Sequence, residues 1–122
     1  MIVAGVMIAG AAGAVLRYLV DRLVQTRIES DFPYGTLVIN VTGSLILGLL
    51  AASALRHGVS ASWFTVLGTG LIGAYTTFST FTFDTFRLLG SDAKASATAN
   101  VAVSLIAGLG AGAAGLALGS LT

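Results

Sequence analysis

Long apolar stretches separated by short charged clusters dominate this 122-residue chain. Four intervals carry no Asp, Glu, Lys or Arg: 1–16, 32–55, 58–83 and 95–122. The first apolar segment can continue to about Leu23 if Arg17 lies near the end of its helix. A membrane-spanning helix needs about 20 mostly apolar residues. The pattern therefore predicts a single integral-membrane domain over 1–122, with four transmembrane helices near residues 2–24, 34–55, 62–89 and 95–121.

Glycine is abundant within these predicted helices, with sixteen residues in the chain. Small residues let membrane helices approach closely, which takes the place of a hydrophobic driving force between them. The fourth predicted helix has GxxxG spacing twice, and for these glycines we expect a packing role: Gly108 with Gly112, and Gly115 with Gly119. Four short, glycine-rich helices form a thin bundle, so an oligomer is expected.

A second glycine cluster lies inside the third predicted helix, at Gly68, Gly70 and Gly73. It predicts a break of that helix at mid-membrane, at Gly70 or at Gly73. Non-helical backbone at this depth survives only where it is buried in protein or lines a cavity. Freed backbone carbonyls at such a break can coordinate a cation.

Composition supports the membrane assignment, because the chain is 56% hydrophobic and 9% charged with a mean hydropathy of +0.95. A soluble domain carries roughly 25% charged residues. The net charge of +1 provides no basic face for nucleic acid, and the absence of cysteine excludes disulfides and thiolate metal sites. His57 stands beside Arg56 without metal-ligand partners nearby, so an enzyme is not expected.

The basic residues are distributed unevenly between the two predicted sides of the membrane. Only Arg56 falls on one side, whereas the first and third connections hold Arg17, Arg22, Arg27, Arg87 and Lys94. The positive-inside rule places these two connections in the cytoplasm and both termini outside.

Polar residues recur at i, i+4 spacing within two predicted helices, which places them on one helix face. The stripes are Thr36, Asn40, Ser44 and Gly48 in the second helix, and Ser96, Asn100, Ser104, Gly108 and Gly112 in the fourth. An unpaired amide in a membrane costs several kcal/mol. Asn40 is therefore expected to face either a neighbouring helix, as an interhelical hydrogen bond, or an aqueous path.

The third predicted helix continues after its glycines as GAYTTFSTFTFDTF (73–86), which places five Ser/Thr hydroxyls within residues 76–83. Phe78, Phe81 and Thr82 fall at i, i+3 and i+4, on one face, whereas Ser79 and Phe83 lie on other faces. Phenylalanine rings are electropositive at the edge. Ring edges beside hydroxyl and amide donors suit an anion path, although aromatic residues at helical spacing also serve ordinary packing.

Two segments, GTLVINVTGSLILG (35–48) and GAYTTFSTFTFDTF (73–86), resemble the two signature regions of the Fluc/CrcB fluoride channels, and LRY (16–18) is similar to the family's first helix. The resemblance implies an all-α membrane protein with four transmembrane helices per subunit and the third broken near its middle. It also implies an antiparallel dimer with two narrow pores at the interface. Such a channel exports fluoride passively across a bacterial-type cell membrane and gives fluoride resistance.

The resemblance also assigns roles to individual residues. Phe78 and Phe81 would present their ring edges to the ion, and Asn40 would be the amide donor. The hydroxyl candidates are Ser79, Thr80, Thr82 and, from the fourth helix, Ser104; Thr82 ranks first because it shares the phenylalanine face.

Two further roles follow from the same resemblance. A structural sodium ion at the two-fold axis of the dimer would be bound by the backbone carbonyls of Gly73 and Thr76 from both subunits. Arg17 would lie near the pore vestibule and raise the local anion concentration, or it snorkels at a helix end.

Alternative assemblies and functions remain open. A subunit that inserts in both orientations needs an even Lys/Arg balance. A heterodimer with an oppositely oriented paralogue, in which this chain could be a non-conducting partner, therefore competes with the favoured homodimer. A small proton-coupled multidrug transporter would need a carboxylate in its first helix, and residues 1–16 contain none. Asp84 lies at the far end of the third helix, where it is expected to pair with Arg87.

A glycine-packed scaffold would leave the TTFSTF motif and Asn40 unexplained. The expected partners are fluoride, membrane lipid and a second subunit, and no nucleic acid.

Overall fold

The structure is a computed structural model that describes residues 1–121, and it is helical apart from short connections. The predicted all-α class is confirmed. The elements in chain order are α1 (Ile2–Arg27), α2 (Tyr34–His57), α3 (Ala61–Phe64), the π-helix η1 (Thr65–Ile72), α4 (Gly73–Tyr75), α5 (Phe78–Gly90) and α6 (Lys94–Gly119). Both α1 and α2 continue two to three residues beyond the expected ends, to Arg27 and His57.

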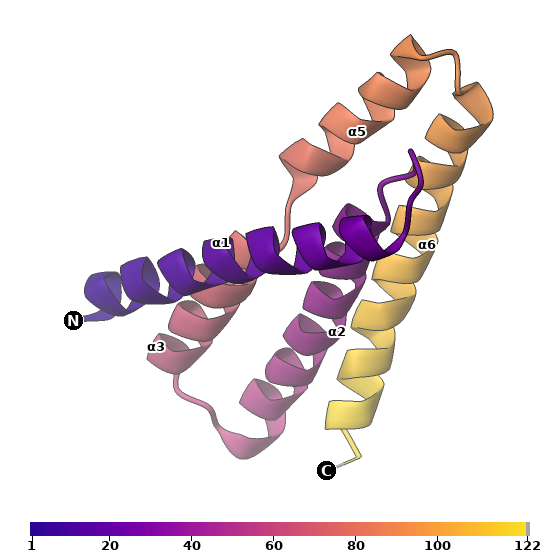
Figure 1. The fold of residues 1–122 in the computed structure, drawn as a ribbon. Helices are drawn as coiled ribbons and strands as arrows, with labels where there is room; N and C mark the ends of the chain where they lie inside the picture. The colour runs from indigo at the N-terminus through magenta and orange to yellow at the C-terminus, as the bar shows by residue number, and fades with distance from the viewer. Residues whose placement is uncertain (122) are drawn as a thin grey trace.

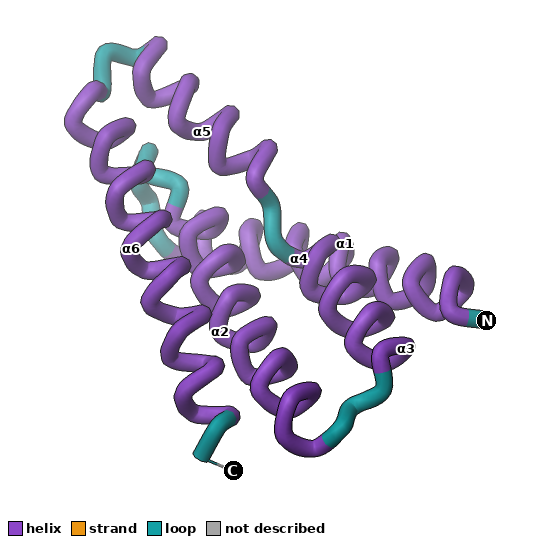
Figure 2. The backbone as a smooth tube through the Cα atoms, turned by 180° about the vertical axis from the view of Figure 1, so that it is seen from behind, coloured by secondary structure: helices purple, strands orange, loops and turns teal. Residues whose placement is uncertain are grey.

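Two helices form the closest pair of the bundle: α2 and α6 run side by side in the same direction (Figure 1). α1 crosses the bundle and packs mainly on η1, and also on α2 and α4. α5 leans away from α2 and turns back into α6 through a short connection (Figure 1). The connection between α4 and α5 is a non-helical loop in the middle of the molecule (Figure 2).

Glycines line the contact between α2 and α6. A Cβ atom added at Gly115 would collide with the Leu45 carbonyl oxygen, and one added at Gly48 would collide with the Gly112 carbonyl oxygen. A Cβ at Gly119 would lie 2.6 Å from the Cβ of Ala52. The two backbones therefore touch directly, as small residues at membrane-helix interfaces allow.

The break in the third segment lies after the glycines and not at Gly70 or Gly73. Residues 65–72 stay helical as the wider π-helix, and the helix is interrupted at Thr76 and Thr77, both of which have extended backbone angles. Gly70 instead permits close packing of α1: a Cβ added there would lie 3.1 Å from the Val6 carbonyl oxygen. Gly70 thus marks a helix contact rather than a helix end.

Within the described residues, three helices are long and apolar enough to cross a membrane: α1, α2 and α6. Large apolar side chains along α1 and α6, such as Ile8 and Ile106, are exposed in the single chain, each to 74%. An apolar surface of this extent requires lipid or protein around it. The chain is a multi-pass membrane protein.

Candidate functional site

The side-chain amide of Asn40 holds the main chain at the break. Its Nδ2 atom donates to the Thr77 carbonyl oxygen over 2.9 Å, and its Oδ1 atom accepts from the Thr77 N–H over 2.8 Å. In a continuous helix, the Thr77 N–H and carbonyl would both be paired within that helix. Here both bind the Asn40 side chain of α2, 37 positions earlier in the chain. Asn40 therefore makes an interhelical contact that stabilises non-helical backbone inside the bundle.

Thr77 caps the N-terminus of α5. Its Oγ1 atom accepts a hydrogen bond from the Thr80 N–H over 3.2 Å, which satisfies one of the unpaired donors of the first helical turn. In a continuous helix, the N–H groups of Thr77 and Thr80 would donate to the carbonyls of Gly73 and Thr76. Because Asn40 and Thr77 side chains take these donors, the two carbonyls keep lone pairs for another ligand.

A groove with a volume of about 470 Å³ opens beside the break. It is lined from α2, from both sides of the break and from α6, by Asn40, Gly43, Ser44, Leu47, Gly73, Thr76, Thr77, Phe78, Phe81, Ser104, Leu105 and Gly108. The groove thus brings together six of the ten residues singled out in the sequence for a pore, vestibule or sodium role, including the aromatic pair. None of the described side chains that line it carries a formal charge.

The aromatic pair lies on the first turn of α5, at the rim of the groove. The ring centroids of Phe78 and Phe81 are 5.6 Å apart, with an interplanar angle of 41°. The Phe78 side chain is 78% exposed in the single chain. Its ring is therefore available to an ion, a lipid or a second subunit.

Four of the singled-out residues do not line this groove. The Thr82 hydroxyl donates to the Phe78 carbonyl within α5 over 2.9 Å, and the Ser79 hydroxyl lies 3.3 Å from that of Thr77. Thr80 and Arg17 line a separate cavity of about 240 Å³, together with Thr36 and Thr77. Only the buried break residue Thr77 is shared by the groove and this cavity.

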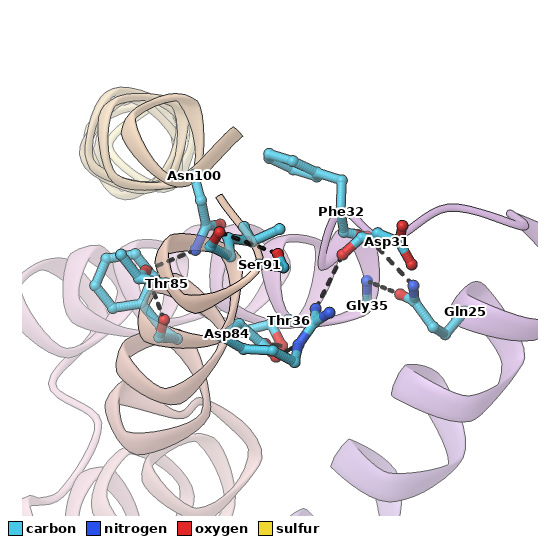
Figure 3. A network of polar contacts seen from close by, with 12 residues as sticks. Gln25, Asp31, Phe32, Gly35, Thr36, Asp84, Thr85, Ser91 and Asn100 are labelled. Atoms are coloured by element: carbon cyan, nitrogen blue, oxygen red, sulfur yellow. Dashed lines mark hydrogen bonds and ion pairs between the residues drawn. The ribbon is translucent and has the colours of Figure 1, made fainter. Parts of the chain in front are cut away.

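A buried polar network joins α5 to α2 (Figure 3). Asp84, 9% exposed, accepts a hydrogen bond from the Thr36 hydroxyl over 2.9 Å and lies 3.7 Å from the Arg87 Nε atom. Arg87 also donates to the Asp31 carbonyl oxygen over 2.9 Å. The expected pairing of Asp84 with Arg87 is therefore present, whereas the bond from Thr36 to Asp84 was not predicted from the sequence.

A second network joins α5 to α6. Asn100, 1% exposed, donates to the Thr85 hydroxyl oxygen over 2.9 Å, and the Thr85 hydroxyl donates to the Phe81 carbonyl (Figure 3 labels Asn100 and Thr85). The Ser104 hydroxyl lies 3.4 Å from the Asn100 Oδ1 atom. Thr36 and Asn100 both belong to the polar stripes of the sequence, which indicated a shared helix face but not these partners on α5.

The chemistry available in the groove is that of neutral donors and ring edges. In the part of the chain that the structure describes, no three His, Cys, Asp or Glu side chains cluster as metal ligands. An amide, hydroxyls and aromatic edges suit weak, repeated contacts with a small ion rather than bond-making steps. The fold and the groove thus define a helical membrane protein of the transport class.

Comparison with known proteins gives the family. Residues 4–116 match the family described as CrcB-like protein, Camphor Resistance (CrcB). This match covers most of the chain, and the protein belongs to the CrcB family. The resemblance drawn from the two sequence motifs is confirmed.

Relatives of this chain are named as ion channels, not as enzymes. A Frankia casuarinae protein named fluoride-specific ion channel FluC 1 is 50% identical, with 92% of each chain covered. A Streptomyces avermitilis protein of the same name is 48% identical over 95% of this chain and 90% of its own. A Mycobacterium tuberculosis protein named fluoride-specific ion channel FluC 2 is 49% identical over 88% and 82%.

Proposed function

We propose that this chain is a subunit of a fluoride-selective channel that lets cytoplasmic fluoride leave the cell passively and so gives fluoride resistance. The observation that carries the proposal is the groove in which Phe78, Phe81, Asn40 and Ser104 meet beside the helix break. The relatives' shared name supplies the ion. Neither the groove nor the relatives' name depends on how Lys and Arg are distributed between the two sides of the membrane.

The physical task of such a channel is to replace the water that fluoride holds tightly. Ion binding must be favourable enough for entry and weak enough for exit. A buried arginine in the path would trap the anion, whereas ring edges and neutral donors in series offer several weak contacts. The uncharged lining of the groove fits this requirement. Ser79, Thr80 and Thr82 act in the path only if a second subunit brings their hydroxyls to it.

A structural sodium ion fits the residues at the break. Gly73 and Thr76 line the groove, and their carbonyls have lost their helical donors to the Asn40 and Thr77 side chains. Carbonyl oxygens are ligands that hard cations prefer. These two carbonyls would hold the ion, and its charge would stabilise the assembly of two subunits around the breaks.

Four membrane crossings follow if α3 to α5 together form the third span. Two antiparallel subunits would then cover the exposed Phe78 and complete two pores. We favour a homodimer. The alternative is a heterodimer of oppositely oriented paralogues, because the uneven Lys/Arg distribution favours a single orientation for this chain. Arg17 would attract anions toward the break from a cavity that it lines together with Thr77, Thr80 and the acidic residue Asp21.

Liposome efflux tests this function directly. The purified protein alone is reconstituted into liposomes loaded with potassium fluoride or potassium chloride, and ion-selective electrodes follow efflux after valinomycin is added. Rapid fluoride release with negligible chloride release is expected. Equal chloride release would contradict the selectivity, and absence of both would point to a required paralogue or to a scaffold.

Replacement of the aromatic pair should slow fluoride efflux. Phe81→Ile and Phe78→Ile keep apolar bulk but remove the electropositive ring edge, and we expect each to lower the fluoride rate about tenfold. The matched control is Phe83→Ile, on the same helix, 67% exposed and outside the groove. A control that falls as far as Phe81→Ile would contradict a specific role for the pair.

A further inference from the structure

A tyrosine immediately precedes the break and contacts the same helix as Asn40. Tyr75 is the last residue of α4, and its hydroxyl oxygen lies 2.9 Å from the Thr42 Oγ1 atom of α2. Its ring passes beside Gly43, since a Cβ added there would lie 3.4 Å from the Tyr75 Cδ1 atom. Both hydroxyl-bearing residues are half-buried.

The direction of this hydrogen bond follows from the other contacts of Thr42. Its hydroxyl lies 2.7 Å from the Val38 carbonyl oxygen, one turn earlier in α2, and a carbonyl can only accept. A hydroxyl has a single proton. Tyr75 is therefore the donor and Thr42 the acceptor.

The break is thus tied to α2 on both sides of Thr76. Tyr75 binds Thr42 just before it, and Asn40 binds the Thr77 main chain just after it. Between them, the Thr76 methyl group packs against Gly43, where a Cβ would collide with it. Thr76 directs its amide and its hydroxyl to the Ile72 carbonyl. Its own carbonyl leaves the helical ladder, because its ψ angle is 159° and the Thr80 N–H donates to the Thr77 side chain.

We propose that the Tyr75 hydroxyl is a positioning group for the conduction path: through Thr42 it fixes the N-terminal side of the break and with it the placement of the Thr76 carbonyl and the first turn of α5. The inference rests on the proposed channel function for its effect on flux. Tyr75 does not line the groove. It acts by restricting the backbone that presents the groove-lining groups.

A double-mutant cycle tests the pair. Tyr75→Phe and Thr42→Val keep the shape of each side chain and remove the hydrogen bond, and each should lower fluoride efflux per reconstituted protein about fivefold. The double variant should be no slower than either single variant, because all three variants lose the same Tyr75–Thr42 hydrogen bond. Independent, multiplying effects, or rates like that of the unmodified chain, would overturn the proposal.

Matched controls come from the same chain. Tyr34→Phe removes a tyrosine hydroxyl remote from the break, and Thr98→Val removes a threonine hydroxyl that bonds one turn back to the Lys94 carbonyl, as Thr42 does to Val38. Neither should change efflux. Equal slowing in the controls would mean that loss of any such hydroxyl is harmful and would overturn the specific role of Tyr75.

Amide hydrogen exchange separates this inference from the channel function. In detergent, Tyr75→Phe should speed exchange about fivefold in peptides covering residues 73–80, with the melting temperature and the exchange of α6 unchanged. If the unmodified chain alone conducts no fluoride, whether for lack of a paralogue or because it is a scaffold, this measurement still decides whether Tyr75 fixes the break. Unchanged exchange at 73–80, or a lower melting temperature with unchanged efflux, would overturn the positioning role.

Discussion

Asn40→Leu is expected to reduce fluoride efflux at least about 100-fold and to destabilise the protein. Leucine fills similar space but leaves the Thr77 N–H and carbonyl without the partners they have on Asn40. Each unsatisfied buried group costs about 1–3 kcal/mol, and a loss of about 3 kcal/mol corresponds to about 100-fold in a rate. Efflux from liposomes and thermal unfolding in detergent measure the two effects.

Two other α2 variants make the Asn40 result specific. Ser53→Ala removes a hydroxyl that bonds the Leu49 carbonyl within the same helix, and it should leave both measurements unchanged. Asn40→Asp keeps an acceptor for the Thr77 N–H but places carboxylate oxygen against the Thr77 carbonyl, so it should be as damaging as leucine. Normal efflux in Asn40→Leu would show that the break does not depend on this amide.

Gly115→Ala is expected to destabilise the bundle by about 1–3 kcal/mol, as overpacking of a close contact does. The added methyl group would collide with the Leu45 carbonyl and lie 2.9 Å from the Leu49 amide nitrogen. These are backbone atoms of α2, which cannot rotate away as a side chain can. The expected result is a lower melting temperature and less folded protein after detergent extraction.

Gly110→Ala is the matched control, because it makes the same chemical change in the same helix. No described atom outside the local helix lies within 4 Å of a Cβ built at Gly110. Alanine is a better helix former than glycine by about 0.5–1 kcal/mol, so this variant should be neutral or more stable. Equal destabilisation by the two substitutions would contradict the direct contact of α2 with α6.

Much of the architecture could be predicted because membrane helices obey a strict rule. Backbone groups in an apolar environment must be paired within the chain, and only helices do so within one segment. Uncharged intervals of spanning length therefore indicated an all-helical protein. The TTFSTF motif with Asn40 led to the family, because those residue types have no use in ordinary lipid-facing helices.

The position of the break depended on tertiary contacts. Asn40 reaches Thr77 across 37 positions, and Gly70 packs against α1, so neither role is visible in local spacing. The same holds for the polar stripes: i, i+4 spacing indicated one helix face but not its partners. In the structure that face of α2 meets Asp84 through Thr36, the break through Asn40 and α6 through Gly48.

Hydropathy and motif identity are local properties, so the helical membrane class, the family and six of the residues that line the groove could be predicted from the sequence alone. Tertiary structure decided where the third segment breaks, which hydroxyls reach the groove and which carbonyls lose their helical donors. The Thr77 N–H pairs with Asn40 only because α2 lies against the break, whereas Thr77 caps the Thr80 N–H locally, within the first turn of α5.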